Sequence, residues 1–156
     1  MGTNPNTNAA GTNTIDYGAD ETTSIRGPLS TTSSVLSSSS SLGIGYKTGA
    51  GSTVTQITSR ATGVTINSIC GQITTDNSSL AAEASAKFTV TNSSVAEADV
   101  IVISFRDAVA LNTDVVVTDT AAGTFEITVI NNNVAAGTAE TGAIVINYAI
   151  IKAVAA

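Results

Sequence analysis

From Thr53 onward, the chain alternates between short runs rich in Val, Ile and Thr and clusters of Asn, Asp, Ser and Gly. β-branched residues favour pleated strands, and turn signals at intervals of roughly ten residues are typical of a sandwich or a barrel. We therefore predict an all-β fold, a single jelly-roll-like β-sandwich of about eight strands. The predicted strands are residues 53–58, 62–69, 72–75, 84–91, 98–105, 114–118, 123–130 and 143–154.

The order of apolar and polar residues within these runs predicts which side chains face the core. Phe125, Ile127 and Val129 alternate with polar residues, which indicates a strand with one buried face. Residues 100–103, and residues 144–146 with 150–151, are instead apolar on both faces. Two explanations remain open for them: a central strand covered on both sides, or burial against another subunit or partner.

The first 42 residues have a different composition, dominated by Thr, Asn, Gly and Ser with isolated apolar residues. Such a segment cannot bury enough apolar surface to offset the entropy lost on ordering. We predict that residues 1–42 form an extended, flexible arm and that residues 43–156 form the sandwich domain. Because no signal-peptide pattern and no apolar run of about 18 residues occurs, we expect synthesis in the cytoplasm and no membrane association.

The charge balance argues against nucleic acid as a partner. Only 12% of the residues are charged, and the net charge is −6 with six Lys and Arg in the whole chain. So few cations cannot neutralise a run of phosphates. Cys70 is the only cysteine, so no disulfide can form within the chain, and we predict that it is a small buried core residue.

The residue types needed for common catalytic sites are missing. The chain has no His, which excludes Ser-His-Asp and Cys-His arrangements. The acids that could form a carboxylate pair or a calcium site lack the spacing of a calcium loop, and we predict that they are solvated charges at strand edges: Glu97 with Asp99, Asp107, and Asp114 with Asp119. We therefore predict no catalytic, cofactor-binding or metal-binding residues, and a protein that is not an enzyme.

Four stretches of the domain carry a resemblance to a known family. They are GIGYKTGAGSTVTQ at 43–56, TSRATGVTIN at 58–67, CGQIT at 70–74 and IVINYAIIKAV at 144–154. They resemble a family of small virion proteins of tailed phages, whose members are capsid-associated accessory proteins of the decoration, cement, knob or head-fibre type. Ser52 and Arg60 depart from the family pattern, where Gly and Lys are expected. The resemblance covers residues 43–156 and does not extend to the arm.

The resemblance implies a bacteriophage structural protein on the outer surface of the capsid, bound non-covalently to the major capsid protein, where it stabilises the shell or mediates surface contacts. Other accessory proteins of the virion, or further copies of this chain as a trimer, are compatible partners, and so is a monomer. The alternative is a fibre or tail adhesion module that binds a host surface component. The candidate capsid contacts are the apolar residues of the arm and of the glycine-rich passage that follows it: Tyr17, Ile25, Leu29, Val35, Leu36, Leu42, Ile44 and Tyr46.

Overall fold

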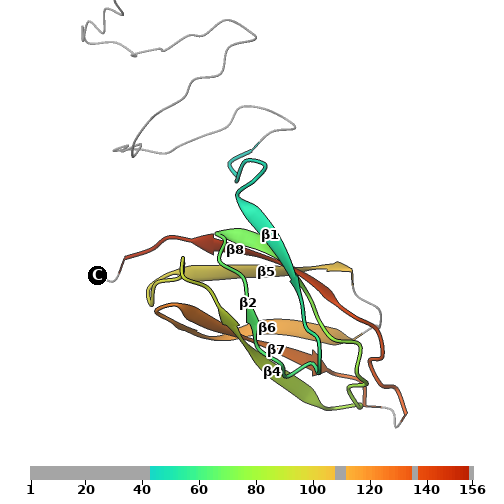
Figure 1. Cartoon of the computed structure of the whole chain (residues 1–156). Coiled ribbons are helices and arrows are strands. Elements are labelled where there is room, and N and C mark those ends of the chain that lie inside the picture. The colour runs from blue at the N-terminus through green and yellow to red at the C-terminus, as the bar shows by residue number, and fades with distance from the viewer. Residues whose placement is uncertain (1–42, 108–111, 135–136, 155–156) are drawn as a thin grey trace, which may run out of the picture. The chain divides into compact units, whose positions relative to one another are not determined.

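Eight strands form two four-stranded sheets that pack face to face, as Figure 1 shows. The computed structural model describes residues 43–107, 112–134 and 137–154. All eight strands belong to one compact unit, Gly45–Ala156. The predicted eight-stranded β-sandwich is confirmed. The strands are β1 Gly51–Thr55, β2 Val64–Thr65, β3 Cys70–Thr74, β4 Ser85–Thr91, β5 Val100–Asp107, β6 Thr113–Ala121, β7 Thr124–Asn131 and β8 Val145–Ile151.

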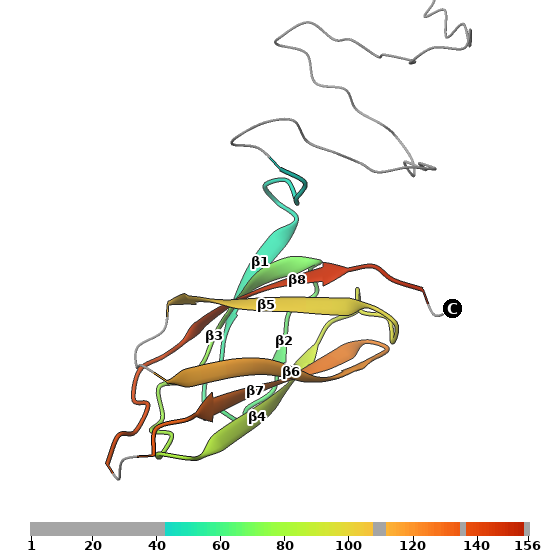
Figure 2. The same ribbon diagram turned by 180° about the vertical axis from the view of Figure 1, so that it is seen from behind.

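The two sheets have related strand orders. Sheet A has the order β1-β3-β8-β5, and sheet B has the order β2-β4-β7-β6. The view from behind in Figure 2 shows them as two layers, with β8 and β5 in one layer and β7 and β6 in the other. One pair in each sheet is parallel, β1 with β3 and β2 with β4, and the other four pairs are antiparallel.

The parallel pairs follow from the path of the chain. From β1 to β4 the chain changes sheet at every step, so strands two apart in sequence lie side by side and run in the same direction. A parallel pair needs such a crossover, because a tight hairpin can join only antiparallel strands. This pairing differs from that of a jelly roll, in which the strands are antiparallel.

The core lies between the inward faces of the sheets. Along β7, the buried side chains are those of Phe125, Ile127 and Val129, as the sequence alternation predicts. From sheet A, Ile146 and Tyr148 of β8 face them, and the rings of Phe125 and Tyr148 lie 5.6 Å apart between centroids. Full burial stabilises the fold by roughly 1.5–3 kcal/mol for each such side chain.

One end of the sandwich is held by a buried arginine in the connection between β1 and β2. Arg60 is 3% exposed, and its guanidinium donates hydrogen bonds to the carbonyl oxygens of Ser78 at 2.6 Å and Gly142 at 2.6 Å and to Oγ1 of Thr75 at 3.1 Å. Burial lowers the pKa of Arg60, and the negative charges of Glu140 and Asp76 oppose this shift. A buried cation is tolerable here because its donors are satisfied by hydrogen bonds.

The ends of the strands differ from the predicted ones, and three of the differences have a local cause. The second predicted strand, 62–69, is reduced to β2, because Asn67 leaves the strand and its side chain accepts a hydrogen bond from the backbone N–H of Ser93. The sixth extends to Ala121, where the two-residue turn Ala122-Gly123 leads into β7. Gly123 has a φ of 81°, a conformation that favours glycine. The last strand ends at Ile151, and Ala153 bonds the Asp99 side chain instead of a neighbouring strand.

Candidate interaction surface

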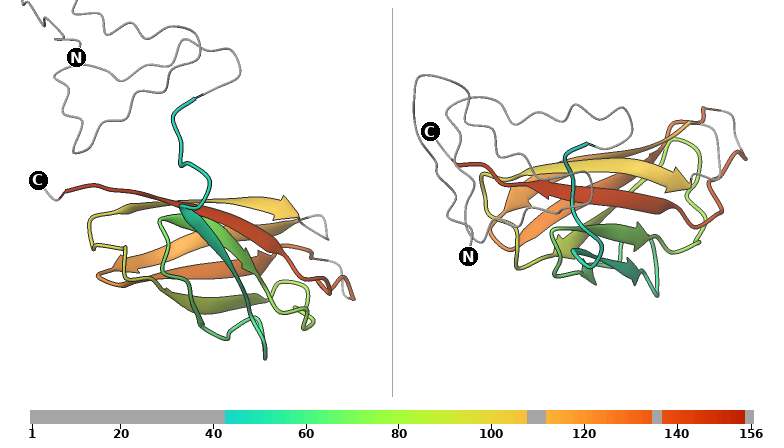
Figure 3. Two further views of the ribbon diagram at one scale, coloured as in Figure 1. Left: turned by 45° about the horizontal axis from the view of Figure 1, so that its top comes forward. Right: turned by 90° about the horizontal axis from the view of Figure 1, so that it is seen from above.

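The outer face of sheet A is formed by the side chains that point away from the core. The alternation along β8 buries Ile146, Tyr148 and Ile150 and turns the residues between them outward. The same alternation along β5 leaves Val100, Val102, Ser104 and Arg106 exposed. Figure 3 shows this sheet from above, with β8 and β5 side by side. The strand register places one polar row across its middle: Thr53, Gln72, Asn147 and Ser104.

Next to this row lies an apolar end, which we define as Cys70, Val102, Ala149, Val100 and Ile151. The register sets Cys70 and Val102 on either side of Ala149, and Val100 beside Ile151. Val100, Val102 and Ile151 are 52%, 47% and 54% exposed. Three neighbouring aliphatic side chains that remain half exposed make this end a candidate contact surface.

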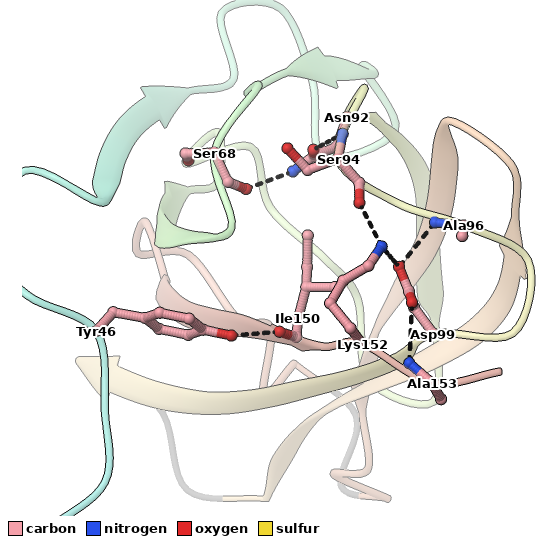
Figure 4. Close-up of polar contacts among 9 residues, drawn as sticks. All are labelled: Tyr46, Ser68, Asn92, Ser94, Ala96, Asp99, Ile150, Lys152 and Ala153. Carbon is pink, nitrogen blue, oxygen red and sulfur yellow. Dashed lines mark hydrogen bonds and ion pairs between the residues drawn. The ribbon is translucent and has the colours of Figure 1, made fainter. Parts of the chain in front are cut away.

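The glycine-rich passage before β1 is attached at this apolar end. The hydroxyl of Tyr46 donates a hydrogen bond to the backbone oxygen of Ile150, the residue before Ile151 (Figure 4). The Tyr46 side chain is 46% exposed. Tyr46 therefore presents aromatic surface to solvent from a position fixed by its hydrogen bond.

An ion pair between the exposed Lys152 and the buried Asp99 holds the chain at the end of β8, as Figure 4 also shows. Lys152 Nζ lies 2.5 Å from Oδ2 of Asp99, and it donates a further hydrogen bond to the carbonyl oxygen of Ser94 at 2.9 Å. The backbone N–H groups of Ala96 and Ala153 donate to the same carboxylate at 2.7 and 3.2 Å. The hydrogen bond from Lys152 and those from the two N–H groups lower the pKa of Asp99 below its ordinary 3.8, although desolvation acts in the opposite direction.

A second hydrogen-bond network lies on the inner side of the same sheet. The hydroxyl of Tyr148 donates to the carbonyl oxygen of Ser68 at 2.9 Å, and Nδ2 of Asn92 donates to that oxygen at 2.8 Å. Burial raises the pKa of Tyr148 above its ordinary 10.0. Since Tyr148 is 3% exposed, these contacts position the sheet and leave its outer face unaffected.

Charge is distributed unequally between the two outer faces. The outer face of sheet B carries Asp114, Asp119 and Glu126, and Lys87 lies 2.8 Å from Glu126. On the outer face of sheet A, among the side chains that the structure describes, Arg106 is the only charged one, and it donates to Oε1 of Gln72 at 3.4 Å. The polar row and the apolar end of sheet A therefore contain no charged residue, although the net charge of the chain is −6.

Two of the sequence predictions are wrong in this region, and one of the two explanations left open for residues 100–103 is excluded. Asp99 is not a solvated edge charge, because its side chain is fully buried against Lys152; Glu97 is exposed as predicted. Cys70 is half-buried and belongs to the outer face of sheet A, so it is not a core residue. Residues 100–103 do not form a covered central strand, because β5 is at the edge of sheet A. Burial against a partner remains as the prediction for Val100 and Val102.

The structure places only two of the predicted contact residues. Tyr46 lies at the apolar end, and Ile44 is exposed in the passage that precedes it. Sequence reasoning did not identify Val102 or Ile151 as site residues, although it noted that both segments are apolar on two faces. The other six predicted contacts lie outside the described residues: Tyr17, Ile25, Leu29, Val35, Leu36 and Leu42.

The described residues offer little for other kinds of site. Within 43–107, 112–134 and 137–154, no group of three or more His, Cys, Asp or Glu side chains could hold a metal ion. No helix in that part of the chain is long and apolar enough to cross a membrane. Searches with this chain found no matching protein-family model, no matching curated protein and no matching solved structure.

Proposed function

We propose that this protein is a structural protein of a bacteriophage particle, which decorates the outer surface of the capsid by binding the major capsid protein non-covalently. The observation that carries the proposal is the contrast between the two outer faces of the sandwich. The outer face of sheet A has a neutral polar row and an apolar end, whereas that of sheet B carries Lys87 and three acids. The resemblance of residues 43–156 to tailed-phage accessory proteins supports the same assignment.

Physical chemistry favours sheet A as the side that meets the shell. Burying a charge in an interface costs several kcal/mol unless a partner compensates it. Thr53, Gln72 and Asn147 can exchange hydrogen bonds with water for hydrogen bonds with a partner, and Val100, Val102 and Ile151 gain from losing contact with water. The charged face of sheet B would remain in solvent, where like charge discourages particles from aggregating.

Binding to the assembled shell would stabilise it by mass action, because a ligand that binds only the assembled state shifts the equilibrium toward that state. Residues 1–42 are expected to add contacts through their scattered apolar residues, because such a segment can become ordered on a partner. This step needs no catalytic group and no cofactor.

The alternative function, an adhesion module for a host surface component, has less support. Carbohydrate platforms usually use exposed aromatic rings. Tyr148 is buried, so Tyr46 is the only described tyrosine with a substantially exposed side chain. We therefore propose decoration of the capsid in preference to adhesion.

The test uses particles of the phage that encodes this chain, prepared without the protein. Purified full-length protein is added, the particles are pelleted, and the bound protein is measured against its concentration. We expect saturable binding, and a Thr53→Glu variant that binds at least about tenfold more weakly, a loss of about 1.4 kcal/mol. Thr53 is exposed on the outer face of sheet A.

Thr91→Glu is the matched control, because Thr91 is an exposed threonine on the outer face of sheet B. It adds the same charge to the other face and should bind like the unaltered protein. A chain that begins at Gly43 measures the contribution of residues 1–42. Absence of binding by full-length protein, together with its detection on the tail in electron micrographs, would overturn the proposal in favour of adhesion.

A further inference from the structure

The sandwich has four edge strands, and most of one of them lacks the usual protection against pairing with another chain. An unprotected edge exposes backbone N–H and C=O groups, and proteins blunt such edges with short strands, charges or bulges. β2 has two residues and β1 has five. β6 carries Asp114 and Asp119 and an irregularity between Val117 and Asp119. β5 has eight residues and begins with the uncharged run Val100 to Phe105.

The hydrogen-bond pattern shows which groups of β5 point to the open side. The backbone N–H of Ile150 donates to Ile69 at 2.9 Å, so the polar groups of Ile150 point toward the β3 side of β8. Ile101, which lies opposite Ile150, is therefore in a non-hydrogen-bonded pair with it. Because the pattern alternates, the N–H and C=O groups of Ile101, Ile103 and Phe105 point away from β8.

The side chains of β5 suit an interface. Ile101, Ile103 and Phe105 pack against the core, whereas Val100 and Val102 are about half exposed on the outer face. No described strand lies beyond β5 in sheet A. The edge therefore combines unpaired backbone groups with exposed aliphatic side chains.

We propose that β5 pairs with β5 of a second copy of this chain, antiparallel about a twofold axis centred on Val102. In this register Ile101 of one copy and Ile103 of the other exchange backbone hydrogen bonds, which makes four bonds across the axis. The two Val102 side chains face each other. The pairing runs from Val100 to Ser104 and so ends before the irregularity between Phe105 and Asp107.

The charge distribution along β5 favours a second copy of this chain as the partner that pairs with this edge. Between Val100 and Phe105 neither strand has a charged residue, so two chains of net charge −6 meet where neither is negative. Asp114 and Asp119 lie on the outer face of sheet B, which points away from sheet A.

The dimer would join the two outer faces of sheet A into one eight-stranded surface. The apolar ends of both copies would then lie on either side of the twofold axis. Because this pairing requires only the isolated protein, it goes beyond the proposed function and is tested without capsids.

The first experiment measures the mass of the full chain in solution by sedimentation equilibrium over a range of concentrations. We expect the mass to rise from 15.5 kDa toward twice that value and to stop there, because a twofold interface closes on itself. Val102→Lys places two cations face to face. It should keep the protein monomeric at concentrations at which the parent protein is at least half dimeric. Val116→Lys is the matched control, since Val116 is a 39% exposed valine on edge strand β6, and it should dimerise normally.

The second experiment tests the register. A non-hydrogen-bonded pair brings Cα atoms to about 4.5 Å, which is within the range that a disulfide spans. Val102→Cys in a Cys70→Ser background should oxidise to a covalent dimer, and Val116→Cys in the same background should not. Far-UV circular dichroism and thermal melting show that each variant is folded.

Three outcomes would overturn the inference. They are a monomer at every concentration, a mass that rises to that of a trimer, and dimerisation that Val102→Lys does not weaken or that Val116→Lys weakens equally. Failure of Val102→Cys to crosslink while the folded Val102→Lys variant is monomeric would overturn the register centred on Val102.

Discussion

The two sheets share one core and face it with the same kinds of side chain, yet their outer faces differ. Sheet B presents Lys87, Glu126 and two further acids to solvent. Sheet A presents threonines, amides and half-exposed aliphatic residues, and Arg106 is its only described charge. The inward residues are determined by the need to fill the core. Core packing does not determine the outward residues. The contrast between the two outer faces is therefore the feature of this fold that function explains best.

The same contrast appears in the ion pairs. Lys87 and Glu126 lie on neighbouring strands of sheet B and keep 56% and 26% of their side-chain surface exposed. In the pair at the end of sheet A, Lys152 is also 53% exposed, but the Asp99 side chain is fully buried and accepts hydrogen bonds from two backbone N–H groups. Exposed pairs contribute little to stability, because water and salt screen them. The pair beside sheet A is therefore the one that holds the backbone.

The largest effect is expected at Arg60, on which both sheets depend. Arg60→Met leaves the carbonyl oxygens of Ser78 and Gly142 without their buried donor. We expect a loss of about 3–5 kcal/mol in the free energy of unfolding, measured by urea denaturation. Arg106→Met, which removes an exposed arginine from sheet A, is the control and should change stability far less. Equal losses in the two variants would contradict the structural role of Arg60.

A smaller effect, confined to sheet A, is expected at Gly71. A Cβ atom added there would lie 2.4 Å from the backbone oxygen of Ser52 and 3.1 Å from the ring of Tyr148. The oxygen belongs to β1 and cannot move aside without shifting the strand. We expect Gly71→Ala to lower the free energy of unfolding by about 1–3 kcal/mol.

Gly45→Ala is the matched control, because nothing lies within 4 Å of the Cβ position at Gly45. Thermal melting of both variants tests the difference. An unchanged melting temperature in Gly71→Ala would show that β1 does not pack against β3 as closely as described.

The strands of this fold are readable from sequence because their signals are local. Val, Ile and Thr runs mark them, and turn residues such as Ala122-Gly123 separate them. Their neighbours in a sheet are not readable in this way. Residues 100–103 are apolar on both faces. This pattern fits a central strand and also an edge strand that binds a partner, and only the strand order β1-β3-β8-β5 distinguishes the two.

The candidate site was predicted only in part, for the same reason. The glycine-rich passage predicts Tyr46 as a contact residue. The atom that positions its side chain is the carbonyl oxygen of Ile150, 104 positions away in sequence. Asp99 was expected in solvent because its partner, Lys152, is 53 positions away. Contacts at such separations depend on the fold, and the local sequence around Asp99 does not predict them.

The smallest effect is expected from pH, and it distinguishes the two ion pairs. The pKa of Asp99 is lowered in the folded protein, so between that value and the ordinary 3.8 the unfolded chain binds more protons than the folded chain. The contribution of Asp99 to stability is thus present above the ordinary value and is lost as the pH falls through this window. Asp99→Asn should be less stable than the parent at neutral pH and should lose less stability on acidification.

Lys87→Met tests the pair on sheet B under the same conditions. The hydrogen bond to Glu126 raises the pKa of Lys87 above 10.5, so the proton uptake of Lys87 itself on folding occurs at alkaline pH, and water and salt weaken its exposed pair with Glu126. Urea denaturation between about pH 2 and pH 7 should give Lys87→Met the pH dependence of the parent and Asp99→Asn a flatter one. If the two variants depended on pH equally, the buried Asp99 carboxylate beside sheet A would hold the backbone no more firmly than the exposed Lys87–Glu126 pair on sheet B.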